Sequence, residues 1–287
     1  MRSSTMLTLT ATCALVGLGA TGFLSTQDAE HTRAELGDST QAAAQLLSVQ
    51  RAAAKAPATS GDSGAAASLK QVAMEELDRL PRAAVEQASQ QPDSETPPSI
   101  KSAADAAARE LFRVAGSPET DAATRLQALN AAQRVWKASG SHPKSPEWAV
   151  APSPECDLAQ DSTAAPESVT DLAHAIDAQV YIAEVTDARG EQSDQPTPES
   201  ERLSEQAQSL DSGFDQALAC SFAPVTEAPA YPVSAADPGA DLKKAQHSVS
   251  QHLDRALADD ALPSDSALYR FLAAQKFTAG NAASSQS

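Results

Sequence analysis

Four side chains that could bind a metal lie on one face of a predicted helix. His174, Asp177, Tyr181 and Glu184 follow one another at spacings of three, four and three residues, which puts them on one side of an α-helix. Imidazole and carboxylate groups are common metal ligands. The face lies opposite or beside the apolar stripe of the same segment, so solvent exposure explains it better. We therefore treat His174, Asp177 and Glu184 as weak metal-ligand candidates.

Other residue patterns that support chemistry are missing from the sequence. His247 and His252 stand five residues apart, a poor spacing for joint ligation from one helix. The chain contains no Gly-x-Ser-x-Gly, Gly-rich phosphate loop, Cys-x-x-Cys or His-Glu-x-x-His pattern. The acidic pairs Glu75-Glu76 and Asp259-Asp260 are adjacent, so we expect them to face solvent. These patterns favour a protein that is not an enzyme and needs no cofactor, with an unrecognised catalytic site as the alternative.

The last third of the chain has the pattern of four amphipathic helices. In the first of them, Ser168 and Asp171 have the spacing of a capping box, and Gly190 suits a left-handed residue at its end. Its apolar residues recur at steps of three or four, as expected for one buried stripe: Val169, Leu172, Ile176, Val180 and Ala183.

The other three helices also have start and stop signals. Thr197-Pro198 and Asp237-Pro238 each place a capping residue before a proline, which suits the first turn of a helix. Ser264 is expected to cap the fourth helix and Gly280 to end it. Because the connection from residue 189 to 197 is short, the first two helices should be antiparallel.

The preceding part of the chain, residues 27–141, is an Ala-rich helical region. We expect four helices: 41–55, 69–88, 99–114 ending at Gly116, and Ser117 to Gly140. The second should be bent or broken at Pro81, and a linker at 56–67 separates it from the first. A Pro-rich linker follows at 142–167. The region either forms a separate module or packs on the bundle, with Trp136 and Trp148 as docking or core residues.

The N-terminus has the layout of a secretory leader. Arg2 precedes an uncharged stretch from Met6 to Leu24, and the first acidic residues follow it. Residues 1–26 are therefore predicted to be a signal peptide. The stretch is also long enough to act as an uncleaved membrane anchor, although its threonines and glycines favour cleavage. Either way, we expect the protein to be secreted or held in the cell envelope.

Two cysteines remain once the leader, which contains Cys13, is removed. Cys156 and Cys220 form an even pair in an exported chain, which suggests a disulfide. Cys156 precedes the first bundle helix and Cys220 ends the second, so an antiparallel hairpin brings both to the same end. Such a bridge would stabilise the fold by roughly 4 kcal/mol. The alternative is two buried free thiols.

The composition narrows the range of partners. The chain has 287 residues, with 38 acidic against 21 basic side chains and a formal net charge of −17. Nucleic acids and anionic membranes both require a basic face. We therefore expect no nucleic-acid partner, and contact with a membrane only through the N-terminal segment if that segment is not cleaved.

Three segments of the C-terminal region carry a resemblance to a known family: 172–189, with Val180-Tyr181 and Ala188-Arg189, the second helix, and 228–238, with its Pro/Tyr-containing connection. Together they resemble a ferritin-like domain of unknown function found in exported bacterial proteins. The resemblance implies a four-helix bundle over about residues 168–280 and no assigned activity. Aligned on Val180-Tyr181, Ile176 replaces the family's Glu and Asp177 its His. No Glu-x-x-His occurs in the chain, so the di-iron ligands of ferritin-like proteins are not reproduced.

These features predict an all-α protein. An Ala-rich helical region comes before an antiparallel ferritin-like four-helix bundle at 168–280, and residues 281–287 form a disordered tail. The function that fits best is a non-catalytic protein of the cell envelope that binds an unknown protein or cell-wall partner. The alternative is a metal-binding ferritin-like protein with a non-standard site.

Overall fold

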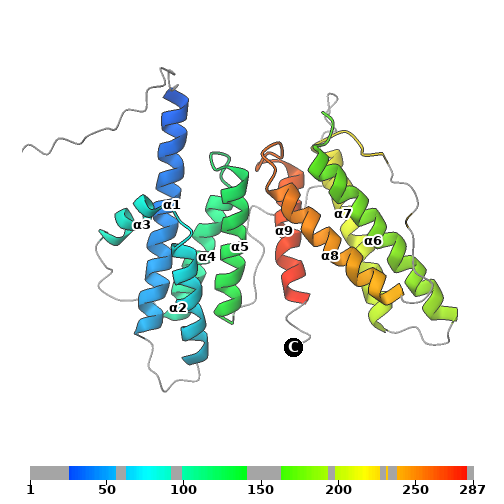
Figure 1. Ribbon diagram of the computed structural model, residues 1–287, viewed down its shortest axis with the longest axis horizontal. Coiled ribbons are helices and arrows are strands. Elements are labelled where there is room, and N and C mark those ends of the chain that lie inside the picture. The colour runs from blue at the N-terminus through cyan, green and yellow to red at the C-terminus, as the bar shows by residue number, and fades with distance from the viewer. Residues whose placement is uncertain are drawn as a thin grey trace, which may run out of the picture.

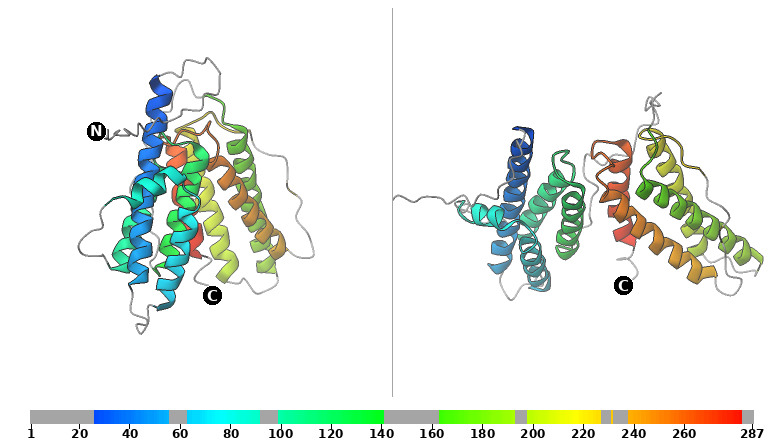
Figure 2. Two further views of the ribbon diagram at one scale, coloured as in Figure 1. Left: turned by 60° about the vertical axis from the view of Figure 1, so that its left-hand side comes forward. Right: turned by 45° about the horizontal axis from the view of Figure 1, so that its top comes forward.

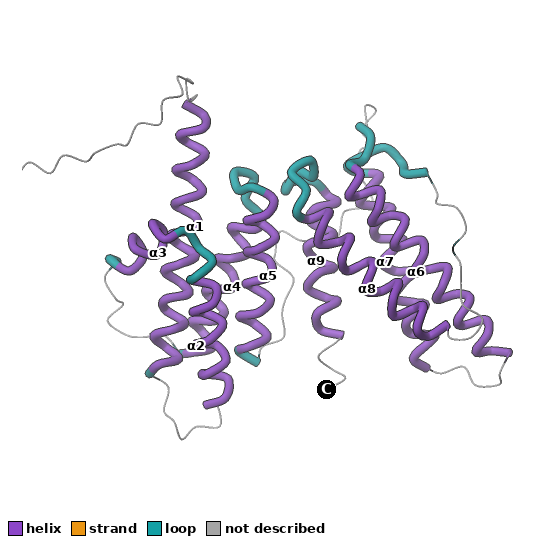
Figure 3. Tube along the Cα trace, in the orientation of Figure 1, coloured by secondary structure: helices purple, strands orange, loops and turns teal. Residues whose placement is uncertain are grey.

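The computed structural model describes residues 26–55, 63–91, 99–140, 163–192, 198–226, 231 and 238–282. In these residues the chain is entirely helical, with nine α-helices and no strand, as the sequence predicts (Figure 3). The helices are α1 (Thr26–Ala54), α2 (Ser63–Leu77), α3 (Arg82–Ser89), α4 (Ile100–Ala115), α5 (Ala122–Ala138), α6 (Glu167–Gln192), α7 (Pro198–Ala219), α8 (Pro238–Leu257) and α9 (Ala267–Ala282).

Several boundaries follow the local signals in the sequence. Pro81 separates α2 from α3, since proline cannot donate the backbone hydrogen bond that a continuous helix needs. The Ser99 side chain accepts a hydrogen bond from the backbone N–H of Ser102, and α4 ends at Gly116. Pro198 and Pro238 are the first residues of α7 and α8. The predicted starts of the second and third bundle helices are therefore confirmed.

Both signals predicted for the ends of α6 are wrong. The hydroxyl of Ser168 donates to Asp259 instead of capping the helix, and α6 begins at Glu167. The carbonyl of Pro166 accepts the backbone N–H groups of Val169 and Thr170. Gly190 does not stop α6, which continues to Gln192. A glycine inside a helix costs only about 1 kcal/mol relative to alanine, and α6 packs along both α7 and α8.

Two further predicted starts lie a few residues too early. Ser266, and not Ser264, caps α9, because its Oγ accepts the backbone N–H of Tyr269. The helix then passes Gly280 and ends at Ala282. Likewise α5 does not begin at Ser117, because the Asp121 side chain caps it from Ala122. For each helix, two residues that could cap it lie close together in sequence. Packing decides between Ser264 and Ser266 for α9, and between Ser117 and Asp121 for α5.

The remaining boundaries shift modestly. The helix expected at 41–55 starts upstream at Thr26, and α2 starts at Ser63, inside the segment expected to be a linker at 56–67. Residues 1–25 of the predicted leader, 141–162 with most of the Pro-rich linker, and 283–287 of the tail lie outside the described residues. None of the helices in the described part of the chain combines the length and hydrophobicity needed to cross a membrane.

The helices form two groups that lie side by side (Figures 1 and 2). In the C-terminal group, α6 packs against α7 and α8, and α9 also packs against α7 and α8, which closes a ring of four helices. In the N-terminal group, α1 packs against α2, α3 and α4, and α5 packs against α4 and α2. Helix α5 also contacts α8 and α9, so the N-terminal helices pack on the C-terminal group.

An aromatic cluster joins the two groups. The ring of Phe277 on α9 lies with its centroid 4.6 Å from that of Phe112 on α4 and 6.1 Å from that of Trp136 on α5. Phe277 is 1 % exposed and Trp136 is 8 % exposed. Trp136 is thus both a core residue and a docking residue, whereas Trp148 lies outside the described residues.

Polar contacts reinforce the same interface. The hydroxyl of Tyr269 on α9 donates to the carbonyl of Ala115, with a distance of 2.7 Å. Arg125 on α5 donates to the carbonyl of Leu262 and lies 5.1 Å from the centroid of the Tyr269 ring. The Asp260 carboxylate accepts the backbone N–H of Ala122. Each of these contacts ties the end of α4 or the start of α5 to the region around the α8–α9 connection.

The close approach of α7 and α9 depends on a glycine. A Cβ at Gly213 would lie 2.6 Å from Cε2 of Phe271, whose ring is buried. We predict that Gly213→Ala destabilises the protein by about 1–2 kcal/mol, since overpacking outweighs the gain in helix propensity. In the control Gly37→Ala, nothing lies within 4 Å of the added Cβ, so stability should rise by about 0.5–1 kcal/mol. Urea unfolding measures both, and equal shifts would contradict the packing explanation.

Candidate functional site

The polar face of α6 is held by structural contacts. Nε2 of His174 is 3.1 Å from the carbonyl oxygen of Thr226, and the hydroxyl of Tyr231 donates to the His174 carbonyl. Tyr181 is 42 % exposed, and Glu184 is exposed as well. The face therefore lies at the surface, where His174 and Tyr231 tether the segment that follows α7.

This face is acidic on both sides of the α6–α7 contact. Burial raises the pKa of Asp211 on α7, and the negative charges of Asp215, Asp177 and Glu184 raise it further. The same environment raises the pKa of Tyr231, chiefly through burial and then through Asp177. Within the described residues, however, no group of three or more His, Cys, Asp or Glu side chains could hold a metal ion. The candidates His174, Asp177 and Glu184 are not gathered into a metal site.

The two histidines of α8 are also separate. Nε2 of His247 is 2.9 Å from the side-chain nitrogen of Gln251, one turn along the same exposed face. His252 is half-buried and has no hydrogen-bond partner for Nδ1 in the described part of the chain. His247 and His252, whose spacing is poor for joint metal ligation, thus lie in two separate environments on α8.

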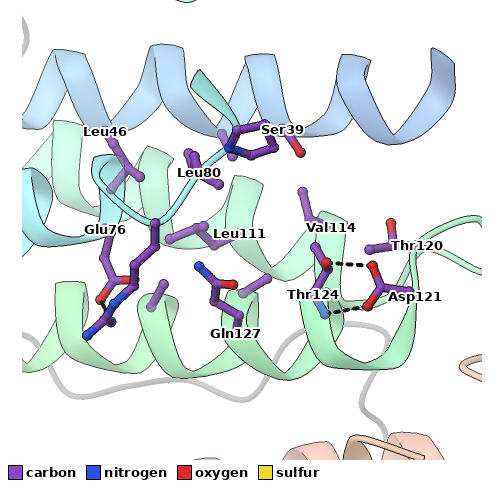
Figure 4. A pocket seen from close by; sticks show the side chains of 15 residues that line it. Ser39, Leu46, Glu76, Leu80, Leu111, Val114, Thr120, Asp121, Thr124 and Gln127 are labelled. Atoms are coloured by element: carbon purple, nitrogen blue, oxygen red, sulfur yellow. Dashed lines mark hydrogen bonds and ion pairs between the residues drawn. The ribbon is translucent and has the colours of Figure 1, made fainter. Parts of the chain in front are cut away.

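A pocket in the N-terminal group is the best candidate for a binding site. It has a volume of about 460 Å³ and lies between α1, the α2–α3 turn, α4 and α5 (Figure 4). This volume falls in the range of small-molecule sites in proteins. Most of the wall is aliphatic, and among the described residues that form it none carries an aromatic ring; the largest apolar side chains are Leu46, Leu80, Pro81, Leu111 and Val114.

One end of the pocket holds a buried carboxylate. Glu76 is 2 % exposed, and its Oε1 accepts hydrogen bonds from Arg79 at 2.7 Å and from Arg134 at 2.5 Å. Arg134 also pairs with Glu75. The expectation that Glu75 and Glu76 both face solvent is therefore wrong for Glu76. Its burial is possible because two guanidinium groups compensate its charge.

The other end of the pocket lies at the start of α5. The Asp121 carboxylate accepts hydrogen bonds from the backbone N–H and the hydroxyl of Thr124, at 2.9 Å and 2.6 Å. Burial alone would raise the pKa of Asp121, but these hydrogen bonds outweigh it and lower the pKa below its usual value. Thr120 is 3 % exposed, and its Oγ1 has no hydrogen-bond partner among the described residues.

These contacts limit the chemistry that the pocket can perform. Glu76 is bound by two arginines and Asp121 caps a helix, so neither carboxylate is placed to act as a general base. The aliphatic wall can exclude water from an apolar ligand. The arrangement suits binding by shape and apolar contact better than it suits proton transfer.

No protein-family model matches the chain, and neither a curated protein nor a solved structure matches it at a significant level. The resemblance to a ferritin-like domain therefore stays a prediction. The pocket lies outside the region that the resemblance covers.

The predicted Cys156–Cys220 pairing also stays a prediction. Cys220, which is half-buried immediately after α7, is disulfide-bonded, but Cys156 lies outside the described residues. The backbone N–H of Ala223 donates to the carbonyl of Thr163, at 2.9 Å. Thr163, seven residues after Cys156 in the sequence, therefore lies next to Ala223, three residues after Cys220.

Proposed function

We propose that this protein is a non-catalytic binding protein and that the pocket of the N-terminal group holds its ligand. The observation that carries the proposal is an aliphatic pocket of about 460 Å³ whose two lining carboxylates are engaged in structural contacts. Apolar pockets with a few placed polar groups are the usual form of small-molecule sites. The ligand that fits is small and mostly apolar.

The proposal keeps the predicted setting in the cell envelope. The leader pattern at residues 1–26 supports export, and the Ala223–Thr163 hydrogen bond supports a Cys156–Cys220 disulfide that only an oxidising compartment would maintain. We also propose that α6–α9 form a ferritin-like bundle without its metal chemistry. The closed ring of contacts among these four helices supports that assignment. In this arrangement the N-terminal group binds the ligand, and the bundle offers a surface for a protein or cell-wall partner.

Filling the pocket should prevent binding. Gln127 lines the pocket and is half-buried, so a phenylalanine ring at this position would occupy ligand space. We predict that wild-type protein binds the neutral apolar dye Nile red and that Gln127→Phe weakens this binding at least about tenfold. Dye fluorescence titration of the full chain measures the effect.

A matched control separates pocket filling from a general change in hydrophobicity. Gln208 is exposed on α7, far from the pocket in sequence, and Gln208→Phe should leave the dye affinity within twofold of wild type, roughly the scatter expected of surface substitutions. Circular dichroism verifies that both variants are folded. Equal dye binding by wild type and Gln127→Phe would overturn the proposed site.

A further inference from the structure

We infer that the pocket takes an unbranched aliphatic molecule of medium chain length that carries an uncharged hydrogen-bonding group at the end next to Thr120. This inference rests on the proposed function and specifies its ligand. It depends on the length of the pocket, the aliphatic character of its wall and the state of the polar groups at its two ends.

The shape favours a linear molecule. Residues from Asp121 to Ala131 of α5 and its cap line the pocket, and ten helical steps span roughly 15 Å. Figure 4 shows Glu76 toward one end, Thr120 and Asp121 toward the other, and Leu111 and Val114 between them. A volume of about 460 Å³ spread over such a length can hold a single extended chain.

The wall favours an aliphatic chain. Between the two ends the wall is mainly leucine, valine, proline and alanine, with Ser39 and Gln127 as polar members, and none of the described residues that line it is aromatic. Sugars and nucleobases are usually held by aromatic stacking, so the wall selects against them. Methylene groups gain free energy by leaving water for such a surface.

Thr120 identifies the polar end of the ligand. Its hydroxyl is buried and lacks a partner among the described residues, a state that costs free energy unless another group satisfies it. Thr120 lines the pocket, so a rotation about its χ1 torsion would bring this hydroxyl to a ligand hydroxyl or amide.

Charge at the same end excludes an anionic group. Asp121 is adjacent to Thr120, and its carboxylate stays ionised because Thr124 hydrogen bonds lower its pKa. A ligand carboxylate placed there would meet a like charge at short range. At the opposite end, the charge of Arg79 is paired with that of Glu76, which weakens the attraction of Arg79 for a ligand carboxylate. An alcohol or amide terminus therefore fits better than a fatty acid.

Displacement of Nile red by decanol, decane and decanoate tests the inference. Wild type should bind decanol roughly threefold to tenfold more tightly than decane, the difference expected of one hydrogen bond, and should bind decanoate less tightly than decanol. Thr120→Val keeps the side-chain shape and should abolish the decanol preference without weakening decane binding. Thr120→Ser retains the hydroxyl and should keep the preference.

The outcomes distinguish this inference from the proposed function. An unchanged decanol preference in Thr120→Val, or decanoate binding more tightly than decanol, would overturn the inference and leave the pocket as a binding site. If none of the three compounds displaces the dye, the inference is also overturned and the pocket remains a binding site. If Gln127→Phe binds Nile red as wild type does, the proposed function fails and the inference fails with it.

Discussion

Replacing Phe277 by alanine should destabilise the full chain by about 3–5 kcal/mol, the usual cost of deleting a buried phenylalanine ring. The ring is 1 % exposed and contacts Phe112 and Trp136, which belong to the other group of helices. The cavity would open where α9 meets α4 and α5. Because one apolar cluster runs through both groups, unfolding should stay a single transition at a lower urea concentration.

Two further variants make this result specific. Tyr181 is 42 % exposed, so Tyr181→Ala should cost less than about 1 kcal/mol. Phe277→Leu leaves a smaller cavity and should cost less than Phe277→Ala. Urea unfolding followed by circular dichroism compares all three. A loss below about 1 kcal/mol for Phe277→Ala, or two separate transitions in the wild type, would contradict a shared core.

Glu76→Gln is the second substitution with a large expected effect. The change removes a buried negative charge that accepts hydrogen bonds from both Arg79 and Arg134. Hydrogen bonds to charged groups contribute about 1.5–3 kcal/mol each. The two arginine side chains remain 49 % and 34 % exposed, so water compensates part of the loss. We predict a net destabilisation of about 2–3 kcal/mol.

The same substitution at an exposed ion pair is the control. Glu86 pairs with Arg82 on the surface of α3, with side chains 59 % and 92 % exposed, and Glu86→Gln should change stability by less than about 0.5 kcal/mol. Thermal or urea unfolding of the two variants measures the difference. If both variants are equally stable, Glu76 does not carry the buried interaction that we assign to it.

The helical class and many boundaries could be predicted from local signals. Pro81, Pro198 and Pro238 each restrict the backbone at one position in a way that neighbours cannot reverse. Gly190 did not end α6, and Ser264 did not cap α9. Glycine and serine are tolerated in several conformations, so packing decided the first outcome and the nearby Ser266 decided the second. Residues that strongly restrict the backbone therefore predicted helix boundaries, whereas conformationally permissive residues did not.

The pocket could not be predicted, because its wall comes from segments far apart in sequence. Ser39 on α1 and Ala131 on α5 line the same cavity, and no spacing rule connects them. One signal was available in α2, where Glu76 falls on the apolar stripe formed by Leu69, Ala73 and Leu77. An acidic residue on such a stripe indicates a buried, paired carboxylate better than a solvated one. No comparable sequence pattern marked Thr120 as a buried residue of the pocket.

Photo-crosslinking tests the location of the ligand most directly. A decanol analogue with a diazirine at its aliphatic end would be bound to the full chain, activated by light and mapped by mass spectrometry. The pocket predicts adducts on the lining residues of α1, α4 and α5, such as Leu46 and Leu111, and their loss in Gln127→Phe. Adducts on α6–α9, or adducts that persist in Gln127→Phe, would contradict a ligand site in the N-terminal group.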